Sequence, residues 1–460
     1  MPKARAAAEN EPSSAVTKKA RARFQSKLTR CQSMHICIAE VRYWSMFRTH
    51  WHSYALGVSD GVEHHSPPRP QPKPGARTMK AAITPKYGTP DVLSMTEVSR
   101  PEVGNHDVLV EVRASVVTQG DRRLRAADFP GISWLPGRLM MGLFRPKNPV
   151  PGTAFAGRVV AVGKAVTRFA EGDDVFGGCM HGAHAEYLAV PEDSPIAPMP
   201  RDLDYAEAAA VPYGAITALV FLRDIAKVQA GERVLVIGAS GGVGRFGVQL
   251  AHHLGADVTG VCSRDHDLVR DLGAGRVIDY TKEDFTDNGE RYDVIFDTTL
   301  DNNFRRSCGS LTSRGRYLSL HMSASLLFQM GLTALTASRG GPRALSGVAM
   351  GDPKQMEAVR ELVDEGALRP VIAKSFPLEG LADAHVFLEE GRARGSVVIE
   401  VGETRRPGAA EGFRLDPPRS PAATRRARAG SRRPRTHPSL PTPAAPSHGT
   451  AVTPRRGVRP

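Results

Sequence analysis

The sequence predicts an α/β protein in which a β-rich domain is joined to a doubly wound parallel sheet. Residues 79 to about 200 hold short apolar strands that Gly and Pro separate at close spacing. From about residue 204, strands alternate with helices, which is typical of parallel βαβ units. A glycine-rich segment, residues 238–244, lies directly between one of those strands and the next helix.

The β-rich part begins with the apolar segment Met-Lys-Ala-Ala-Ile-Thr that opens at Met79. Alternating apolar residues or short apolar runs then mark each strand that we expect. The predicted strands are residues 79–84, 107–117, 157–163, 173–178 and 185–190.

The second part opens with a predicted helix over 205–228 and the apolar strand 233–239, which reads as a strand buried on both faces. The predicted elements that follow are helix 243–254, strand 257–262, helix 266–272, strands 276–280, 292–298 and 315–320, helix 353–365, and strands 372–377 and 396–401. The apolar stretch 326–350 shows no clear period.

The two ends of the chain carry its basic character. Of the formal charge of +13, residues 1–78 carry +8 and residues 405–460 carry +11, so residues 79–404 carry −6. Both ends are rich in Pro and Arg, and we expect them to be disordered because they cannot bury enough apolar surface. Nucleic-acid binding therefore stays open only for the Arg-rich tail, around 425–435, where no aromatic residues are interleaved.

Cysteine usage and hydropathy indicate the kind of compartment in which the protein resides. The five cysteines form no CxxC pair and no disulfide framework, which indicates a reducing compartment, and we expect the cytoplasm. No uninterrupted apolar run reaches about 18 residues, so we expect no membrane span, and we expect no membrane as a partner.

The glycine-rich segment Gly-Ala-Ser-Gly-Gly-Val-Gly is the sharpest motif. Glycines allow a tight turn and a close backbone approach to a pyrophosphate, and the following helix offers free amides and a positive dipole end. The predicted phosphate-binding residues are Ser240, Gly241, Gly242, Val243 and Gly244.

The end of the next strand indicates the cofactor. NAD sites place a carboxylate there for the ribose 2′-hydroxyl, whereas NADP sites need positive charge for the 2′-phosphate. Here Ser263 and Arg264 come first and Asp265 follows, so we predict NADPH, with NADH as the alternative if Arg264 pairs with Asp265.

With these motifs in place, residues 79–404 resemble the medium-chain dehydrogenase/reductases, in particular the zinc-independent, quinone-oxidoreductase-like branch. The residues that carry the resemblance are 79–82 (MKAA), 151–163 (PGTAFAGRVVAVG), 171–176 (EGDDVF), 185–187 (AEY), 208–212 (AAAVP), 217–218 (TA), 231–236 (GERVLV), the glycine-rich loop, 272–274 (LGA) and 277–280 (VIDY).

The resemblance implies a chaperonin-10-like β domain with an inserted Rossmann domain. We therefore expect a chaperonin-10-like catalytic domain from residues 79–203 and 346–404, and an NADPH-binding Rossmann domain over 204–345. A homodimer is the family expectation.

The resemblance also implies that zinc is absent. Zinc-dependent relatives have a Gly-His-Glu motif where this chain has Gly152-Thr153-Ala154, and the position of their early Cys falls within residues 117–121. The local cluster Cys179, His181 and His184 lacks a matching fourth ligand, so we expect no metal there.

Site residues follow from the same resemblance. The quinone-reductase relatives carry an Asn-Pro-x-Asp turn that faces the nicotinamide, and Thr118-Gln-Gly-Asp121 keeps the Asp and replaces the Asn with Thr. Thr118 and Asp121 are therefore the catalytic candidates, with a turn cap paired to Arg122 or Arg123 as the alternative for Asp121. Thr217 and Tyr280 match positions that line the cofactor, while Gly395-Ser396 replaces a frequent Gly-Lys.

The expected activity is NADPH-dependent hydride transfer to a quinone or an α,β-unsaturated carbonyl, a small-molecule acceptor. The alternatives on the same fold are an alcohol dehydrogenase and an enoyl-thioester reductase. No residue is required as a general acid, and His321 is a geometric candidate only. We expect the stretch 326–350 to shape the acceptor pocket or a subunit contact.

Overall fold

The computed structural model describes residues 75–129, 133–336 and 340–402, and these residues belong to one compact unit. Within these ranges, no helix combines the length and apolar character needed to cross a bilayer. The predictions of disordered ends and of a nucleic-acid-binding tail concern residues that, apart from 75–78, lie outside the described ranges.

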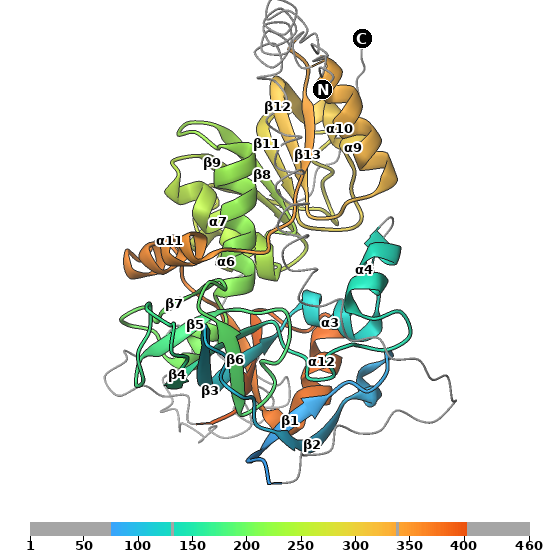
Figure 1. Cartoon of the computed structure of the whole chain (residues 1–460). Coiled ribbons are helices and arrows are strands. Elements are labelled where there is room, and N and C mark those ends of the chain that lie inside the picture. Colours follow the sequence, from blue (N-terminus) through green and yellow to red (C-terminus); the bar gives the residue numbers. More distant parts are fainter. Residues whose placement is uncertain (1–74, 130–132, 337–339, 403–460) are drawn as a thin grey trace, which may run out of the picture. The chain divides into compact units, whose positions relative to one another are not determined.

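A seven-stranded sheet forms the β-rich part, in the order β14-β15-β3-β4-β5-β7, with β6 also paired to β3. Its strands are β3 (Asp107–Val117), β4 (Ala154–Val162), β5 (Asp174–Gly178), β6 (Tyr187–Pro191), β7 (Ile196–Pro198), β14 (Ile372–Pro377) and β15 (Ser396–Glu400). The last two strands come from the C-terminal part of the chain, so the second sheet is inserted between β7 and β14 (Figure 1).

Smaller elements complete this part. They are β1 (Thr78–Ile83), η2 (Pro90–Val92), β2 (Ser94–Ser99), α3 (Gln119–Ala126), α4 (Trp134–Met141), α11 (Pro353–Asp364), η7 (Leu378–Gly380) and α12 (Leu381–Glu389). β1 and β2 form an antiparallel pair, and α12 packs against β15, β14 and η2.

The inserted sheet is six-stranded and parallel throughout, in the order β10-β9-β8-β11-β12-β13. Its strands are β8 (Arg233–Ile237), β9 (Asp257–Cys262), β10 (Arg276–Asp279), β11 (Tyr292–Asp297), β12 (Leu311–Ser319) and β13 (Arg343–Ser346). The helices that connect them are α7 (Gly242–His253), α8 (His266–Asp271), α9 (Phe304–Ser307), η5 (Cys308–Ser310) and α10 (Ala324–Thr336).

Successive side chains of β8 point to opposite faces of the sheet and pack into two different hydrophobic cores, as expected for a strand that is covered on both faces. Val234 and Val236 join the core that includes α7, while Leu235 and Ile237 join the core that includes Leu326 of α10. Helices therefore cover both faces of the sheet (Figure 1), and the predicted doubly wound fold is confirmed.

Two predicted segments differ from the structure. The helix expected over 205–228 is instead α5 (Tyr205–Ala209), α6 (Pro212–Leu219) and a π-helix, η4 (Val220–Ala226), because Pro212 lacks the amide that a continuous helix needs. The stretch 326–350, which shows no period, contains most of α10 and all of β13. α10 shows no apolar stripe because it buries Leu326 and yet exposes Phe328 and Leu335.

The segment from α5 to α6 joins the two sheets through one apolar core. The buried alanines of α5 pack against β3 and β4, and α6 packs against α7. Gly214 permits the second contact, because a Cβ there would lie 2.4 Å from the Phe246 ring and 2.7 Å from the Gly242 carbonyl oxygen.

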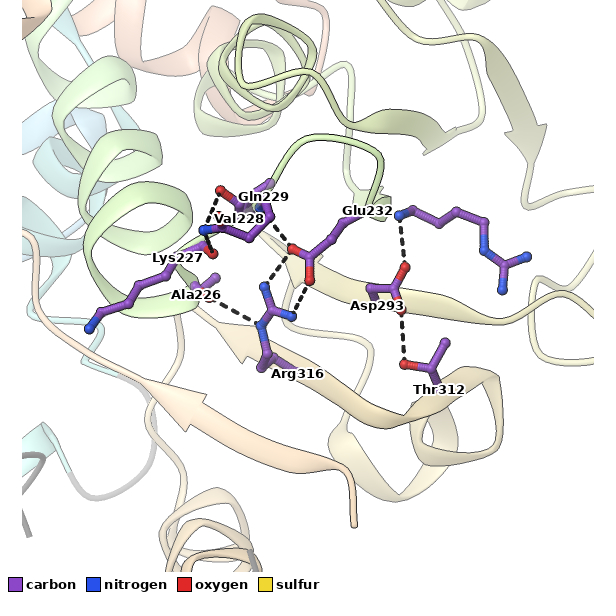
Figure 2. Close-up of polar contacts among 9 residues, drawn as sticks. Ala226, Lys227, Val228, Gln229, Glu232, Asp293, Thr312 and Arg316 are labelled. Atoms are coloured by element: carbon purple, nitrogen blue, oxygen red, sulfur yellow. Dashed lines mark hydrogen bonds and ion pairs between the residues drawn. The ribbon is translucent and has the colours of Figure 1, made fainter. Parts of the chain in front are cut away.

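A polar cluster at the amino ends of the parallel strands fixes η4 to the sheet (Figure 2). Arg316 of β12 donates to both carboxylate oxygens of Glu232, at 2.6 and 2.7 Å, and to the Ala226 carbonyl at 3.1 Å. The backbone amide of Gln229 donates to the Glu232 carboxylate at 2.9 Å. This fork-to-fork geometry is the strongest form of side-chain ion pair, and the Arg316 hydrogen bond lowers the pKa of Glu232.

We predict that Glu232→Gln lowers the free energy of unfolding at neutral pH by about 1–2 kcal/mol, because a partly buried bidentate pair is lost. The folded state lowers the pKa of Glu232, so the ionised carboxylate stabilises the folded protein fully at pH values above its unfolded-state pKa of about 4.3. This stabilisation is lost as the pH falls from there through the lower pKa of the folded state. Denaturant unfolding of both proteins across this pH range measures the difference.

Glu290→Gln is the matched control. Its carboxylate is 44% exposed and lies 3.5 Å from Arg233 and 3.6 Å from Arg276, so we expect a change below about 0.5 kcal/mol. Equal losses in the two variants would contradict the role given to the Glu232–Arg316 pair.

Candidate active site

The glycine-rich loop turns the chain from β8 into α7. Gly238 has a left-handed φ of +78°. The backbone amides of Gly238 and Ala239 donate to the Val261 carbonyl, and the Gly241 amide donates to the Gly238 carbonyl at 2.8 Å. Gly241 is the N-cap of α7 and provides no side-chain cap. The first amides of α7 therefore remain available to an anion.

The glycines of the loop have different roles. A Cβ on Gly244 would lie 2.1 Å from the Gly238 carbonyl oxygen, so this position needs glycine for the fold itself. A Cβ on Gly242 would meet no atom within 4 Å, so the space above the first turn of α7 is open. A pyrophosphate fits this open cradle, and the buried Val243 would contribute its backbone amide alone.

The strand register brings the predicted adenosine-end residues together. β9 and β10 pair with Cys262 opposite Asp279, so Ser263 and Tyr280, which follow them, lie at the same edge of the sheet. Tyr280 is 62% exposed, and Arg264 is exposed as well. The phosphate loop leaves this edge too, because β8 pairs with β9.

Asp265 is paired with an arginine from the end of the chain's catalytic part. It has a left-handed φ of 58°, its carboxylate side chain is only 8% exposed, and its Oδ1 lies 3.4 Å from Arg394 Nε. The expected alternative, an Arg264–Asp265 pair, is wrong. Among the described residues, the Arg264 side chain has no hydrogen-bond or ion-pair partner, and its guanidinium lies beside the turn at Gly391.

A second buried arginine lies behind the loop. Arg245 donates to the Arg394 carbonyl at 2.6 Å and to the Gly241 carbonyl at 3.3 Å. Burial lowers the pKa of Arg245 to about 10, and the charge of Asp265 opposes this shift. Asp265 thus interacts electrostatically with two arginines, Arg394 and Arg245, and within the described ranges not with Arg264.

At the other end of the candidate site, α3 begins with a capping box. The Thr118 hydroxyl donates to Asp121 Oδ2 at 2.6 Å and accepts from the Asp121 amide at 3.1 Å, while the Thr118 amide donates to Oδ2 at 2.8 Å. Asp121 therefore caps the turn, but not through the expected arginines, since Arg122 bonds Gln119 and Asp128 and Arg123 contacts His321. Asp121 Oδ1 is buried without a partner among the described residues.

The start of α3 lies against α6. A Cβ on Gly120 would lie 3.1 Å from the Tyr213 ring and 3.2 Å from the Thr118 hydroxyl, so these three residues are in close contact. Thr217 lies one turn after Tyr213 and donates to the Tyr213 carbonyl at 2.7 Å. Burial, followed by the charge of Asp121, raises the pKa of Tyr213.

An arginine–histidine contact connects α3 with the inserted sheet. Arg123 Nη1 lies 3.1 Å from His321 Nδ1, just beyond the carboxyl end of β12. Arg123 Nη2 also lies 3.4 Å from His321 Nε2. Because arginine only donates and a neutral imidazole has a single acceptor nitrogen, only one of these two contacts is a hydrogen bond. Burial and the charge of Arg123 lower the pKa of His321 to about 4, so the ring is neutral at neutral pH.

The local Cys/His cluster does not converge on a point. Cys179 donates its thiol to the Gly152 carbonyl at 3.4 Å, and His184 Nε2 bonds the Val116 carbonyl at 3.1 Å. Burial raises the pKa of Cys179 and lowers those of His181 and His184. In the described ranges, no three His, Cys, Asp or Glu side chains are grouped so that they could hold a metal ion.

The predicted residues thus fall into two groups. The loop, Ser263, Arg264 and Tyr280 share the carboxyl edge of the parallel sheet, and Thr118, Asp121 and Thr217 lie where α3 meets α6. Sequence reasoning missed Tyr213, Arg245 and Arg394. Tyr213 follows the quoted motif 208–212 directly and Arg394 precedes the Gly395-Ser396 pair, so both were adjacent to segments already singled out.

We predict that the two loop glycines respond differently to alanine. Gly244→Ala lowers the melting temperature by several degrees, because its Cβ would collide with the Gly238 backbone. Gly242→Ala keeps the melting temperature of the wild type but weakens dinucleotide binding, because its Cβ projects into the open cradle. Differential scanning fluorimetry and calorimetric titration measure the two effects, and equal responses would contradict the assigned roles.

Comparison with known proteins agrees with this architecture. Residues 104–201 match the family "Alcohol dehydrogenase GroES-like domain", and residues 272–399 match "Zinc-binding dehydrogenase". The chain is 30% identical to 2-methylene-furan-3-one reductase of Solanum lycopersicum, over 70% of this chain and 79% of that protein.

Two further relatives cover the same part of the chain. NADPH-dependent alkenal/one oxidoreductase, chloroplastic, of Arabidopsis thaliana is 30% identical over 70% of this chain and 80% of its own. The structure of the quinone oxidoreductase from Coxiella burnetii aligns with a TM-score of 0.61 at 27% identity, over 71% of this chain and all of that chain. The chain therefore belongs to the medium-chain dehydrogenase/reductase superfamily, with quinone and alkenal oxidoreductases among its relatives, and is an oxidoreductase.

Proposed function

We propose that this protein transfers a hydride from NADPH to a quinone or an α,β-unsaturated carbonyl, without zinc. The observation that carries the proposal is the carboxyl edge of the parallel sheet. There the open cradle at Gly242 and the free Arg264 guanidinium flank the end of β9. The names of the relatives in tomato, Arabidopsis and Coxiella support the reaction class.

The preference for NADPH follows from the charges at the end of β9. NAD sites use a carboxylate there to accept from the ribose 2′-hydroxyl. In this chain the Asp265 carboxylate is occupied by Arg394 and lies near Arg245, whereas Ser263 and Arg264 remain for a 2′-phosphate. We propose that Ser240, Gly241, Gly242, Val243 and Gly244 hold the pyrophosphate and that Tyr280 covers the adenosine end.

We predict that Arg264→Ala weakens NADPH binding about ten- to hundredfold and leaves NADH binding nearly unchanged, because one charge-assisted contact is lost. Titration of both dinucleotides into the full-length protein measures the ratio of the Kd for NADH to the Kd for NADPH. Arg270→Ala is the control, since this arginine of α8 is paired with Asp267 at 2.8 Å and should not contribute. If Arg264→Ala leaves this ratio of dissociation constants unchanged, the cofactor assignment is contradicted.

At the reacting end, we propose that Thr118, Asp121 and Thr217 position the acceptor and the nicotinamide. When bound, NADPH supplies the hydride. The chain has to align the two reactants, and good alignment alone accounts for several kcal/mol of a barrier, about 7–11 in favourable cases. Asp121 fixes the Thr118 hydroxyl by two hydrogen bonds, and Thr217 is fixed by the Tyr213 carbonyl. Both hydroxyls therefore keep a set orientation.

The same site indicates the class of acceptor. Reduction of a simple aldehyde gains from a Lewis acid on the carbonyl, whereas quinones and enones are already electron-poor. Thr153 stands at the His position of the zinc-dependent Gly-His-Glu motif, and residues 117–121, where the early Cys position falls, contain no Cys. The neutral His321 is no strong acid at neutral pH. We propose that the final proton comes from water.

The decisive experiment is an acceptor screen with the full-length protein and NADPH oxidation as the readout. We expect turnover with quinones or enones and little with simple aldehydes. Turnover confined to aldehydes would support an alcohol dehydrogenase instead, and turnover confined to enoyl thioesters would support the enoyl-thioester alternative. Either result would contradict the proposed acceptor class.

We further propose the expected division of the chain, with residues 204–345 as the NADPH-binding domain and residues 79–203 and 346–404 as the catalytic domain. A reducing compartment such as the cytoplasm is consistent with the free cysteines Cys179, Cys262 and Cys308. Nucleic-acid binding by the Arg-rich tail stays a prediction.

We propose a homodimer because, in the part of the chain that the structure describes, β13 is the last strand of the parallel sheet. β13 pairs with β12 on one side, and the neighbouring α10 exposes Phe328 (68%), Leu332 (47%) and Leu335 (81%). An unpaired edge beside apolar side chains is suited to a two-fold contact with a second copy. We predict that Phe328→Asp with Leu335→Asp gives a monomer in sedimentation equilibrium where the wild type is a dimer, and a wild-type monomer would contradict this.

A further inference from the structure

α4 and the loop after it expose a set of apolar side chains. Within α4, only Gly137 is buried. The exposed residues, here called the α4 surface, are Trp134 (50%), Leu135 (53%), Leu139 (52%), Met140 (39%), Leu143 (44%) and Phe144 (85%).

The α4 surface is held outward by contacts on its inner side. A Cβ on Gly137 would lie 2.7 Å from the Phe129 ring, which shows how closely the helix packs there. The Tyr87 hydroxyl donates to the Gly142 carbonyl at 2.8 Å, and Arg138 lies 4.7 Å from the Tyr87 ring centre and donates to the Leu143 carbonyl at 2.9 Å. The apolar side chains are therefore exposed by the fold and cannot turn inward without breaking these contacts.

Two basic residues adjoin the apolar side chains. Arg145 follows Phe144 directly and is exposed, and Lys147 comes two residues later and donates to the Leu139 carbonyl at 3.1 Å. The sequence between Asp128 and Glu171 contains no acidic residue, so no carboxylate of this segment offsets the charge. Tryptophan and long aliphatic side chains with arginine or lysine at their rim are the composition of segments that lie in the interface of an anionic bilayer.

The size of the surface argues against a protein partner. An eight-residue helix is about 12 Å long, whereas a stable protein interface takes about 800 Å² from each partner. A bilayer sets no such minimum, because attachment there sums apolar insertion and attraction to anionic headgroups.

We propose that the α4 surface attaches this oxidoreductase to the surface of an anionic lipid bilayer. Leu135 and Leu139 are four residues apart and share one face of α4, so they enter the acyl boundary together with Phe144. Arg145 and Lys147 remain at the level of the phosphates. The attachment is interfacial and requires no membrane-spanning helix.

The first test uses tryptophan emission. The chain contains Trp44, Trp51 and Trp134, so Trp44→Phe with Trp51→Phe leaves Trp134 as the sole reporter in the full-length protein. With phosphatidylcholine–phosphatidylserine vesicles, we expect a blue shift of its emission and quenching by brominated acyl chains. Vesicle binding without either change would show that the basic ends alone attach the chain, and would overturn the proposal.

The second test measures partitioning in sedimentation with the same vesicles. The full-length triple variant Leu135→Ser, Leu139→Ser, Phe144→Ser keeps both basic ends, and we expect its partition coefficient to fall at least about tenfold. Val386→Ser in α12, where the valine is 39% exposed, is the matched control and should partition as the wild type does. An unchanged melting temperature and NADPH affinity of the triple variant show that its fold is retained.

Three results would overturn the proposal. The triple variant could partition like the wild type, or it could change the molecular mass in sedimentation equilibrium, which would assign the α4 surface to a protein contact. It could also raise the KM for a water-soluble acceptor without a change in partitioning, which would assign the surface to acceptor binding.

Discussion

Gly244 approaches the Gly238 carbonyl so closely that no side chain fits between them, and most of the site depends on this contact. It sets the first turn of α7 directly above the end of β8, so that the free amides of the helix face the open space at Gly242. The other face of the same turn receives α6 through Gly214, and α6 carries Tyr213 and Thr217. Two close backbone approaches thus connect the phosphate cradle to the proposed reacting end.

The net positive charge of the chain and the charged groups of the candidate site lie in different parts of the sequence. The ends of the chain hold the net positive charge, while residues 79–404 are mildly acidic. Within that part, the decisive charges are single groups at the end of β9. Arg394, which comes from the turn before β15, pairs with Asp265, the carboxylate that follows β9. A contact between the two parts of the chain therefore supports the proposed cofactor preference.

Local patterns in the sequence predicted most of the fold. β9 and β14 have the predicted bounds, and the glycine-rich loop lies between strand and helix as expected, because burial and backbone conformation dictate those residues locally. The resemblance of residues 79–404 to a known family identified the insertion of one domain in the other. α10 and β13 were missed because α10 exposes apolar residues, which hides its helical period.

The details of the candidate site depend on contacts between distant residues. Arg123 meets His321, 198 positions away, and Arg245 meets Arg394, 149 positions away, and no local pattern reports such pairs. The Thr118–Asp121 cap, by contrast, spans three residues and was foreseen as a turn cap, although with arginine partners that the structure does not show. Sequence reasoning therefore singled out the candidate residues and not the pairs that fix them.

Isotope transfer tests the central claim most directly. The full-length protein would be supplied with NADPH dideuterated at C4 and a simple α,β-unsaturated ketone, and the product would be analysed by mass spectrometry and NMR. The account predicts one deuterium on the β-carbon of a saturated ketone. A product without deuterium, or deuterium on the carbonyl carbon of an unsaturated alcohol, would contradict it.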